Sequence, residues 1–203
     1  MKNILVLFLL VLVSTSLKAQ EYSFGLMLGT NIYSMNLTSG DGTNLGVDKG
    51  ITPFNLGLFG TKKIGEKSGM RLNIFYGQSV ERGFFSDNIS TGKINIQKLN
   101  LQVFYKYYPS KVYGEGKYLL AGPRMTLINS AERRDDGFDF TDLYNDSNFG
   151  LNAGLGFHLT SQLNIEFLID YGLPNIVNIG DNKVSSIGAF LNVLFNIESL
   201  ISK

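Results

Sequence analysis

The chain has no cysteine among its 203 residues. No disulfide can therefore staple the fold, and there is no cysteine near the amino terminus to which a lipid could be attached. The formal net charge is also small, +1 from 18 basic and 17 acidic side chains. A chain without a basic excess is poorly suited to binding nucleic acid, which is therefore not expected as a partner.

Long apolar runs are scarce. The longest spans residues 4–13, just after Lys2, and it is too short for a membrane-spanning helix, which needs roughly 20 residues. A more polar stretch follows and ends in the small residue Ala19. A basic start, a short apolar core and a small final residue are typical of a cleaved secretory signal. We expect residues 1–19 to be a signal peptide and residues 20–203 to form one domain, whose fold the following patterns indicate.

The rest of the chain alternates apolar and polar residues and lacks helical spacing. In residues 99–107, for example, the odd positions are apolar or aromatic and the even positions are mostly polar. Such alternation is typical of a strand with one apolar face. The pattern predicts strands over residues 22–35, 51–62, 69–82, 93–108, 117–130, 148–159, 162–173 and 185–198. Each is long enough for a tilted membrane-spanning strand, which needs about 9 to 11 residues.

The connections between these strands alternate in length. Residues 65–68, 109–116 and 160–161 form short or turn-like connections, whereas residues 36–50, 83–92, 131–147 and 174–184 are longer and polar. Outer-membrane barrels have short turns in the periplasm and long loops outside the cell. The sequence therefore predicts an all-β fold: an eight-stranded antiparallel up-and-down transmembrane β-barrel in a bacterial outer membrane, with both termini on the periplasmic side.

A soluble barrel of the lipocalin type is the competing fold, with its apolar side chains inside and its polar side chains outside. Two features favour the membrane form. The polar face holds many glycines and charges of both signs, whereas a soluble surface should carry more lysine and glutamate. Aromatic residues also gather toward strand ends, as interfacial girdles require, at Tyr22, Tyr33, Tyr105, Tyr107, Phe149 and Tyr171.

Several short runs carry a family resemblance. Residues 98–109, KLNLQVFYKYYP, and residues 117–123, KYLLAGP, resemble the central hairpin of the PorT-like outer-membrane barrel family of Bacteroidota. Residues 170–176 and 187–195 resemble its seventh and eighth strands. The resemblance implies the same fold and location. Because the family takes its name from a member needed for protein secretion, it also suggests an accessory role in secretion, although no residue motif carries that role.

His158 is the only histidine. Some eight-stranded outer-membrane barrels modify lipid A in the outer leaflet with a histidine, a serine and a carboxylate, which makes such an enzyme an alternative function. General-base catalysis needs a hydroxyl within reach of the histidine. Ser161 lies nearby in the sequence, but no Gly-x-Ser-x-Gly run is present. We favour a histidine packed in the lumen, and we expect no enzyme activity, no cofactor and no metal.

Charged residues at the polar positions of the alternating pattern should point into the lumen, and they are candidates for a structural charge network. They are Arg71, Lys106, Arg124, Glu166, Asp170 and Glu198. Charges in a narrow barrel must be paired, because an isolated buried ion is very costly. We expect Arg124 and Glu166 to pair across the lumen. A gated polar conduit is the alternative to a structural plug, which we favour because small barrels have interiors filled by side chains.

Residues 132–146 hold six acidic and two basic side chains together with three aromatic ones. A long exposed loop with aromatic residues is a candidate for binding a partner. The residues concerned are Asp135, Asp136, Phe138, Phe140 and Tyr144. We therefore expect a structural or interaction role, with loops 131–147 and 36–50 as contact surfaces. The expected partners are outer-membrane lipid and lipopolysaccharide, and other envelope proteins.

Overall fold

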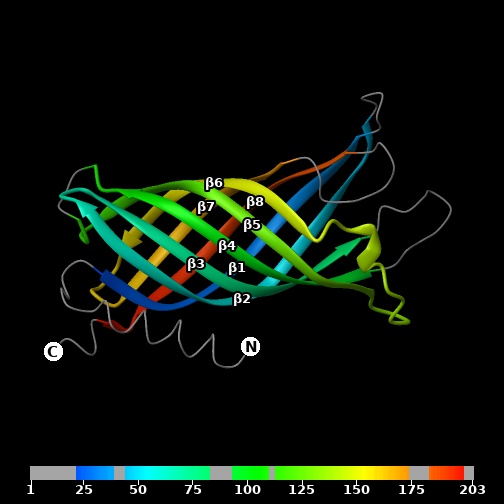
Figure 1. Cartoon of the computed structure of the whole chain (residues 1–203), viewed down its shortest axis with the longest axis horizontal. Coiled ribbons are helices and arrows are strands. Elements are labelled where there is room, and N and C mark those ends of the chain that lie inside the picture. The colour runs from blue at the N-terminus through cyan, green and yellow to red at the C-terminus, as the bar shows by residue number, and fades with distance from the viewer. Residues whose placement is uncertain (1–21, 39–43, 83–92, 110–112, 174–182, 199–203) are drawn as a thin grey trace.

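The computed structural model describes residues 22–38, 44–82, 93–109, 113–173 and 183–198. Their eight strands form one closed antiparallel barrel in which each strand pairs with its neighbours in the sequence and β1 pairs with β8 (Figure 1). The strands are β1 (Tyr22–Thr38), β2 (Asn44–Gly65), β3 (Ser68–Arg82), β4 (Lys93–Tyr107), β5 (Lys117–Arg133), β6 (Ser147–His158), β7 (Leu163–Gly172) and β8 (Lys183–Asn196). The predicted fold is confirmed. The expected signal peptide, 1–19, lies outside the described residues.

The two ends of the barrel differ. At one end, here called the turn end, residues 66–67, 108–116 and 159–162 join the strands. At the other, the loop end, β5 and β6 are joined by residues 134–146, which include the short 3-10 helix η1 (Thr141–Leu143). Figure 1 shows this connection folding back at its end of the barrel. No helix within the described ranges is long and apolar enough to cross a membrane.

Large apolar side chains cover the outside of the barrel. Leu58 and Ile169, for example, are 60% and 63% exposed. Inside, polar side chains such as Asn73, Gln102 and Glu166 are fully buried. Because a soluble barrel has the opposite polarity, the lipocalin-type alternative is wrong. An apolar exterior of this extent needs lipid around it.

The apolar surface begins to include polar side chains at one level near the loop end. Along β3 the outward position after Tyr76 is Gln78, and along β4 the outward position next to Leu99 is Gln97. Strands β1 to β5 nevertheless continue past this level, as far as Arg82 in β3. Strand backbone outside the lipid can carry polar side chains on both faces, so its alternation disappears. This explains why the alternation predicted a start of β2 at residue 51 and an end of β5 at residue 130, although these strands extend to Asn44 and Arg133.

Aromatic side chains mark both edges of the apolar surface. Five of the six predicted girdle residues face outward and are 37–54% exposed: Tyr22, Tyr105, Tyr107, Phe149 and Tyr171. The prediction for Tyr33 is wrong. Its side chain points into the lumen, where its hydroxyl donates a hydrogen bond to Glu81. Ile32, its neighbour in β1, takes the lipid-facing position and is 59% exposed.

Candidate functional site: the lumen and the β5–β6 connection

Two apolar clusters fill the lumen, one toward each end. The cluster toward the turn end consists of Met27, Phe59, Phe75, Phe104, Tyr108, Tyr118, Leu120, Leu168, Phe190 and Leu194. The cluster at the loop end consists of Met35, Ile94, Ile96, Ala131, Tyr144 and Val184. Ion pairs and amide side chains lie within and between the two clusters. The interior is therefore packed with side chains, as expected of a small barrel.

A bidentate ion pair lies among the apolar residues of the turn-end half. Both terminal nitrogens of the Arg71 guanidinium donate to Glu166, Nη1 to Oε1 and Nη2 to Oε2, the latter at 2.5 Å. The hydroxyl of Tyr118 donates to the same carboxylate at 2.6 Å. The two charged side chains are 1% and 0% exposed. Such a pair is held by its geometry and extra hydrogen bond, since desolvation of each ion costs several kcal/mol.

Lys106 adds a second buried cation beside this pair. Its ammonium nitrogen lies 4.0 Å from the ring centre of Tyr118, 5.5 Å from that of Tyr108 and 6.0 Å from that of Tyr113. It makes no hydrogen bond or ion pair with any other described residue, and the residue is 4% exposed. The faces of three tyrosine rings therefore provide its close contacts, and cation–π attraction is strongest where water is excluded.

Arg124 forms the second ion pair of the lumen, with Asp170. Its Nε and Nη2 donate to the two carboxylate oxygens at 2.7 and 3.2 Å. The expected pair of Arg124 with Glu166 is wrong, because Glu166 is bound by Arg71. A glycine makes this arrangement possible: a Cβ at Gly150 would lie 2.6 Å from Nη2 of Arg124. The missing side chain leaves room for the guanidinium to lie across β6 toward β7.

Amide side chains connect this pair to the opposite wall. Asn152 donates to Asp170 at 2.6 Å, Gln102 to Asn152 at 2.9 Å and Asn73 to Gln102 at 3.0 Å. The predicted network contained only charged residues and did not include these amides. Their alternation onto the lumen face of β3, β4 and β6 is the sequence signal that could have indicated them.

Glu198, the sixth residue of the predicted charge network, lies beyond Asn196, where β8 ends, and is partly exposed. Because strand parity no longer applies after the strand has ended, its place in the lumen stays a prediction. Partial burial raises the pKa of its carboxyl.

A tight turn forms the outer part of the β5–β6 connection. The carboxylate of Asp136 accepts hydrogen bonds from Nε of Arg133 at 2.8 Å and from the backbone N–H of Phe138 at 3.1 Å. Gly137 has a φ of 71°, a left-handed conformation that glycine adopts without strain. The N–H of Phe138 lowers the pKa of the Asp136 carboxyl, with a further contribution from Arg133. We call residues 133–139 the outer turn.

The residues of the predicted partner-binding loop divide into two groups. Asp135, Asp136 and Phe138 are exposed on the outer turn, and Phe138 is 56% exposed although it is apolar. The Arg133 guanidinium lies 5.3 Å from the ring centre of Phe138. Phe140 and Tyr144 instead pack into the loop-end cluster. Tyr144 is only 5% exposed, so a partner cannot reach it in this conformation.

His158 lies at the turn end, in contact with tyrosines. Its Nε2 is 2.9 Å from the hydroxyl of Tyr108, and its ring stacks on that of Tyr108 with centres 5.8 Å apart. The ring of Tyr118 packs against it at 5.0 Å. No hydrogen bond joins His158 to a serine within the described residues. The arrangement is that of a packed side chain closing the floor of the lumen.

A closed barrel with an apolar exterior, aromatic edges and a polar interior defines an integral outer-membrane barrel. Residues 5–195 match the model of the Outer membrane protein beta-barrel domain family. The chain belongs to this family, and the protein is located in the bacterial outer membrane. No curated protein sequence matches the chain.

Solved structures of small outer-membrane barrels resemble this one. Neisserial surface protein A is 13% identical, with a TM-score of 0.52 over 84% of this chain and 97% of its own. Ail of Yersinia pestis, solved with the heparin analogue sucrose octasulfate, is 15% identical, with a TM-score of 0.45 over 87% and 99% of the two chains. OprG of Pseudomonas aeruginosa is 17% identical, with a TM-score of 0.42 over 87% and 96%. At these identities the likeness concerns the fold.

Proposed function

We propose that this barrel serves as a non-enzymatic interaction protein that presents its outer turn to a macromolecule outside the cell. The observation that carries the proposal is the exposed ring of Phe138, which is fixed on a hydrogen-bonded turn beyond the apolar surface. An apolar side chain in water at such a site contributes binding energy once a partner covers it. Because the turn is already ordered, little conformational entropy is lost on binding.

The orientation follows from the connections. Short turns of outer-membrane barrels face the periplasm and longer connections face outward, so the loop end with the outer turn faces the exterior. The carboxylates of Asp135 and Asp136 belong to the same turn as the apolar ring, and both are exposed. A partner surface that offers an apolar pocket edged by basic groups would match this arrangement.

Photo-crosslinking in intact cells of the native host tests the proposal. A photoreactive amino acid is placed at Phe138, and the control variant carries it at Gln97, which is exposed on the polar outer wall of β4 near the same end. We expect a discrete adduct from position 138 that is absent from position 97. It should disappear when Arg133→Met removes the guanidinium that lies over the ring and donates to Asp136. Equal crosslinking at both positions, or none, would contradict the proposal.

The PorT-like resemblance remains a finer prediction within the family. It would gain support if a deletion strain lost the export of secreted proteases. The lipid A enzyme alternative would gain support if a His158→Ala strain lost a lipid A modification. The tyrosine contacts of His158 favour a packing role instead.

A further inference from the structure

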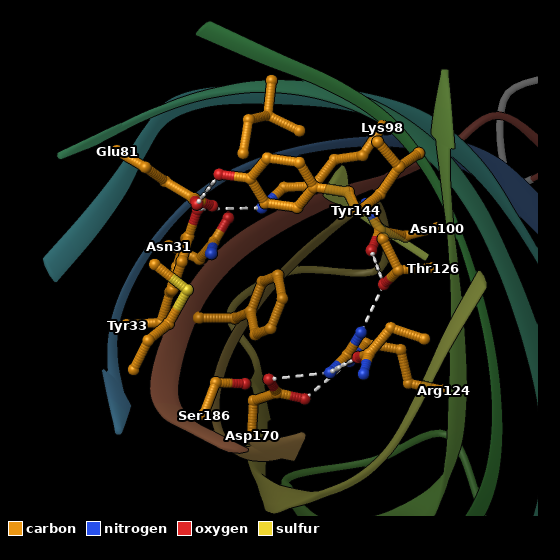
Figure 2. Close-up of a pocket in the computed structure, with 15 residues that line it drawn as sticks. Asn31, Tyr33, Glu81, Lys98, Asn100, Arg124, Thr126, Tyr144, Asp170 and Ser186 are labelled. Carbon is orange, nitrogen blue, oxygen red and sulfur yellow. Dashed lines mark hydrogen bonds and ion pairs between the residues drawn. The ribbon is translucent and has the colours of Figure 1, made fainter. Parts of the chain in front are cut away.

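A cavity lies in the lumen beneath Tyr144, between the loop-end cluster and the Arg124–Asp170 pair (Figure 2). Its volume is about 60 Å³. A water molecule needs roughly 15 Å³ of such space, so the cavity has room for about four non-hydrogen atoms. Figure 2 shows side chains converging on it from β1, β3, β4, β5, β7 and β8.

The carboxylates that line the cavity already accept hydrogen bonds from neighbouring side chains. In Glu81, Oε1 accepts from the hydroxyl of Tyr33 and Oε2 from that of Tyr144, the latter at 3.3 Å. In Asp170, both oxygens accept from Arg124, and Oδ1 also accepts from Asn152. The strongest acceptors of the cavity are therefore engaged by the protein itself.

Several donors of the cavity are not engaged in this way. The Lys98 ammonium donates one hydrogen bond, to the hydroxyl of Tyr33 at 3.3 Å, which leaves two of its N–H groups. Asn31 accepts from Asn55 through Oδ1 at 3.1 Å, but its Nδ2 donates to no described residue. The hydroxyl of Ser186 also has no hydrogen-bond partner among them. Asn31 and Ser186 are 6% and 7% exposed, so both lie well inside the barrel.

We propose that this cavity binds a small molecule with an oxygen acceptor, held by Lys98 and Asn31. A carboxylate and an amide carbonyl share this chemistry. The charges lining the cavity sum to zero, since Lys98 and Arg124 balance Glu81 and Asp170. A carboxylate would gain the attraction of Lys98 but would lie close to Glu81, whereas an amide would avoid that repulsion. The rings of Phe190 and Tyr144 would contact the apolar part of the ligand.

This site is separate from the proposed contact surface, because the outer turn does not line the cavity. Ligand binding and partner binding can therefore fail independently. Replacing Phe138 should leave the cavity unaffected.

Nuclear magnetic resonance of the labelled, folded barrel in detergent micelles tests the proposal. Acetate, acetamide and methylammonium are titrated separately at constant ionic strength. We expect saturable shifts of the amide signals of Asn31, Lys98 and Ser186 with acetate, acetamide or both, and none with methylammonium, which offers only donors. Binding by acetate alone would identify a carboxylate ligand, and binding by acetamide alone a neutral one.

Two variants and a control complete the test. Lys98→Met keeps the length of the stem but removes the ammonium, and it should weaken binding at least tenfold. Lys93→Met changes an exposed lysine of the same strand and should leave affinity unchanged. Asn31→Ala should weaken binding several-fold, and it tests the proposal if Lys98→Met does not fold. No saturable shifts in the wild type, equal binding of methylammonium, or unchanged affinity in the variants that fold would overturn the proposal.

Discussion

Replacing Glu166 by glutamine should strongly destabilise the barrel. In the native protein the Arg71 guanidinium, 1% exposed, has both terminal nitrogens bound to this carboxylate. Glutamine keeps a similar shape but removes the negative charge, so the arginine stays buried without a counter-ion. Removing one partner of a buried ion pair costs about 3–5 kcal/mol. The matched control is Glu132→Gln, which removes the same charge at an exposed position of β5 and should have almost no effect.

Removing the Arg71–Glu166 pair together with the Tyr118 hydroxyl should restore most of that loss. In the triple variant Arg71→Met, Glu166→Met, Tyr118→Phe, no buried charge or hydroxyl of the pair is left without its partner. Exchange of a buried ion pair for apolar residues is often neutral or stabilising by about 1–4 kcal/mol. Lys106 loses the attraction of Glu166 together with the repulsion of Arg71, and these changes oppose each other.

Urea unfolding in lipid vesicles measures these free energies. The fraction of protein that migrates as the folded band without boiling is followed against urea concentration. A loss below about 1 kcal/mol for Glu166→Gln relative to Glu132→Gln would refute the reasoning about the buried pair. The same holds if the triple variant is as unstable as Glu166→Gln.

Three further predictions concern other parts of the barrel. Gly156→Ala should destabilise the folded barrel by about 1–3 kcal/mol, because its new Cβ would lie 2.2 Å from the Tyr118 ring. Gly60→Ala should instead stabilise the barrel by about 0.4–1 kcal/mol, because no atom lies within 4 Å of its new Cβ. A higher urea midpoint for Gly156→Ala than for Gly60→Ala would contradict the packing. Ile169→Arg should cost about 2–4 kcal/mol in vesicles if this position faces mid-membrane lipid, and a cost no larger than that of Gln97→Arg would argue against a lipid-facing position. The Phe138 N–H lowers the pKa of the Asp136 carboxyl. At pH values above the ordinary pKa of aspartate, the ionised carboxylate should therefore stabilise the outer turn. This stabilisation should be lost as the pH falls through the lowered pKa. A titration midpoint of the Phe138 amide signal at or above the ordinary value for aspartate would contradict this.

Most of the fold prediction was based on strand parity, the alternation of inward and outward side chains along each strand. Where lipid lies on one side and the packed lumen on the other, side chains must alternate, and the sequence located β6 and β7 to within one residue at each end. The start of β2 and the end of β5 lie beyond the lipid, where this constraint is absent. Glu198 shows the same limit, since parity has no meaning past the end of β8.

Pairing within the lumen could not be read from parity. Parity placed Arg71, Arg124, Glu166 and Asp170 on the inner face, but the choice of partner depends on which glycines leave room for a long side chain. Gly150 leaves room for the Arg124 guanidinium beside Asp170. Tyr144 illustrates a second limit: in sequence it belongs to a polar loop, but the connection folds back and buries it over the lumen.

Labelling of single-cysteine variants on intact cells tests the account most directly. The chain has no cysteine of its own, so an introduced one is unique. Asp135→Cys lies on the outer turn, and Glu66→Cys lies in the exposed turn between β2 and β3 at the opposite end. With a membrane-impermeant maleimide, we predict labelling of Asp135→Cys on intact cells and of Glu66→Cys only after the outer membrane is permeabilised. Labelling of Glu66→Cys on intact cells, with Asp135→Cys protected, would contradict the orientation on which the proposed function depends.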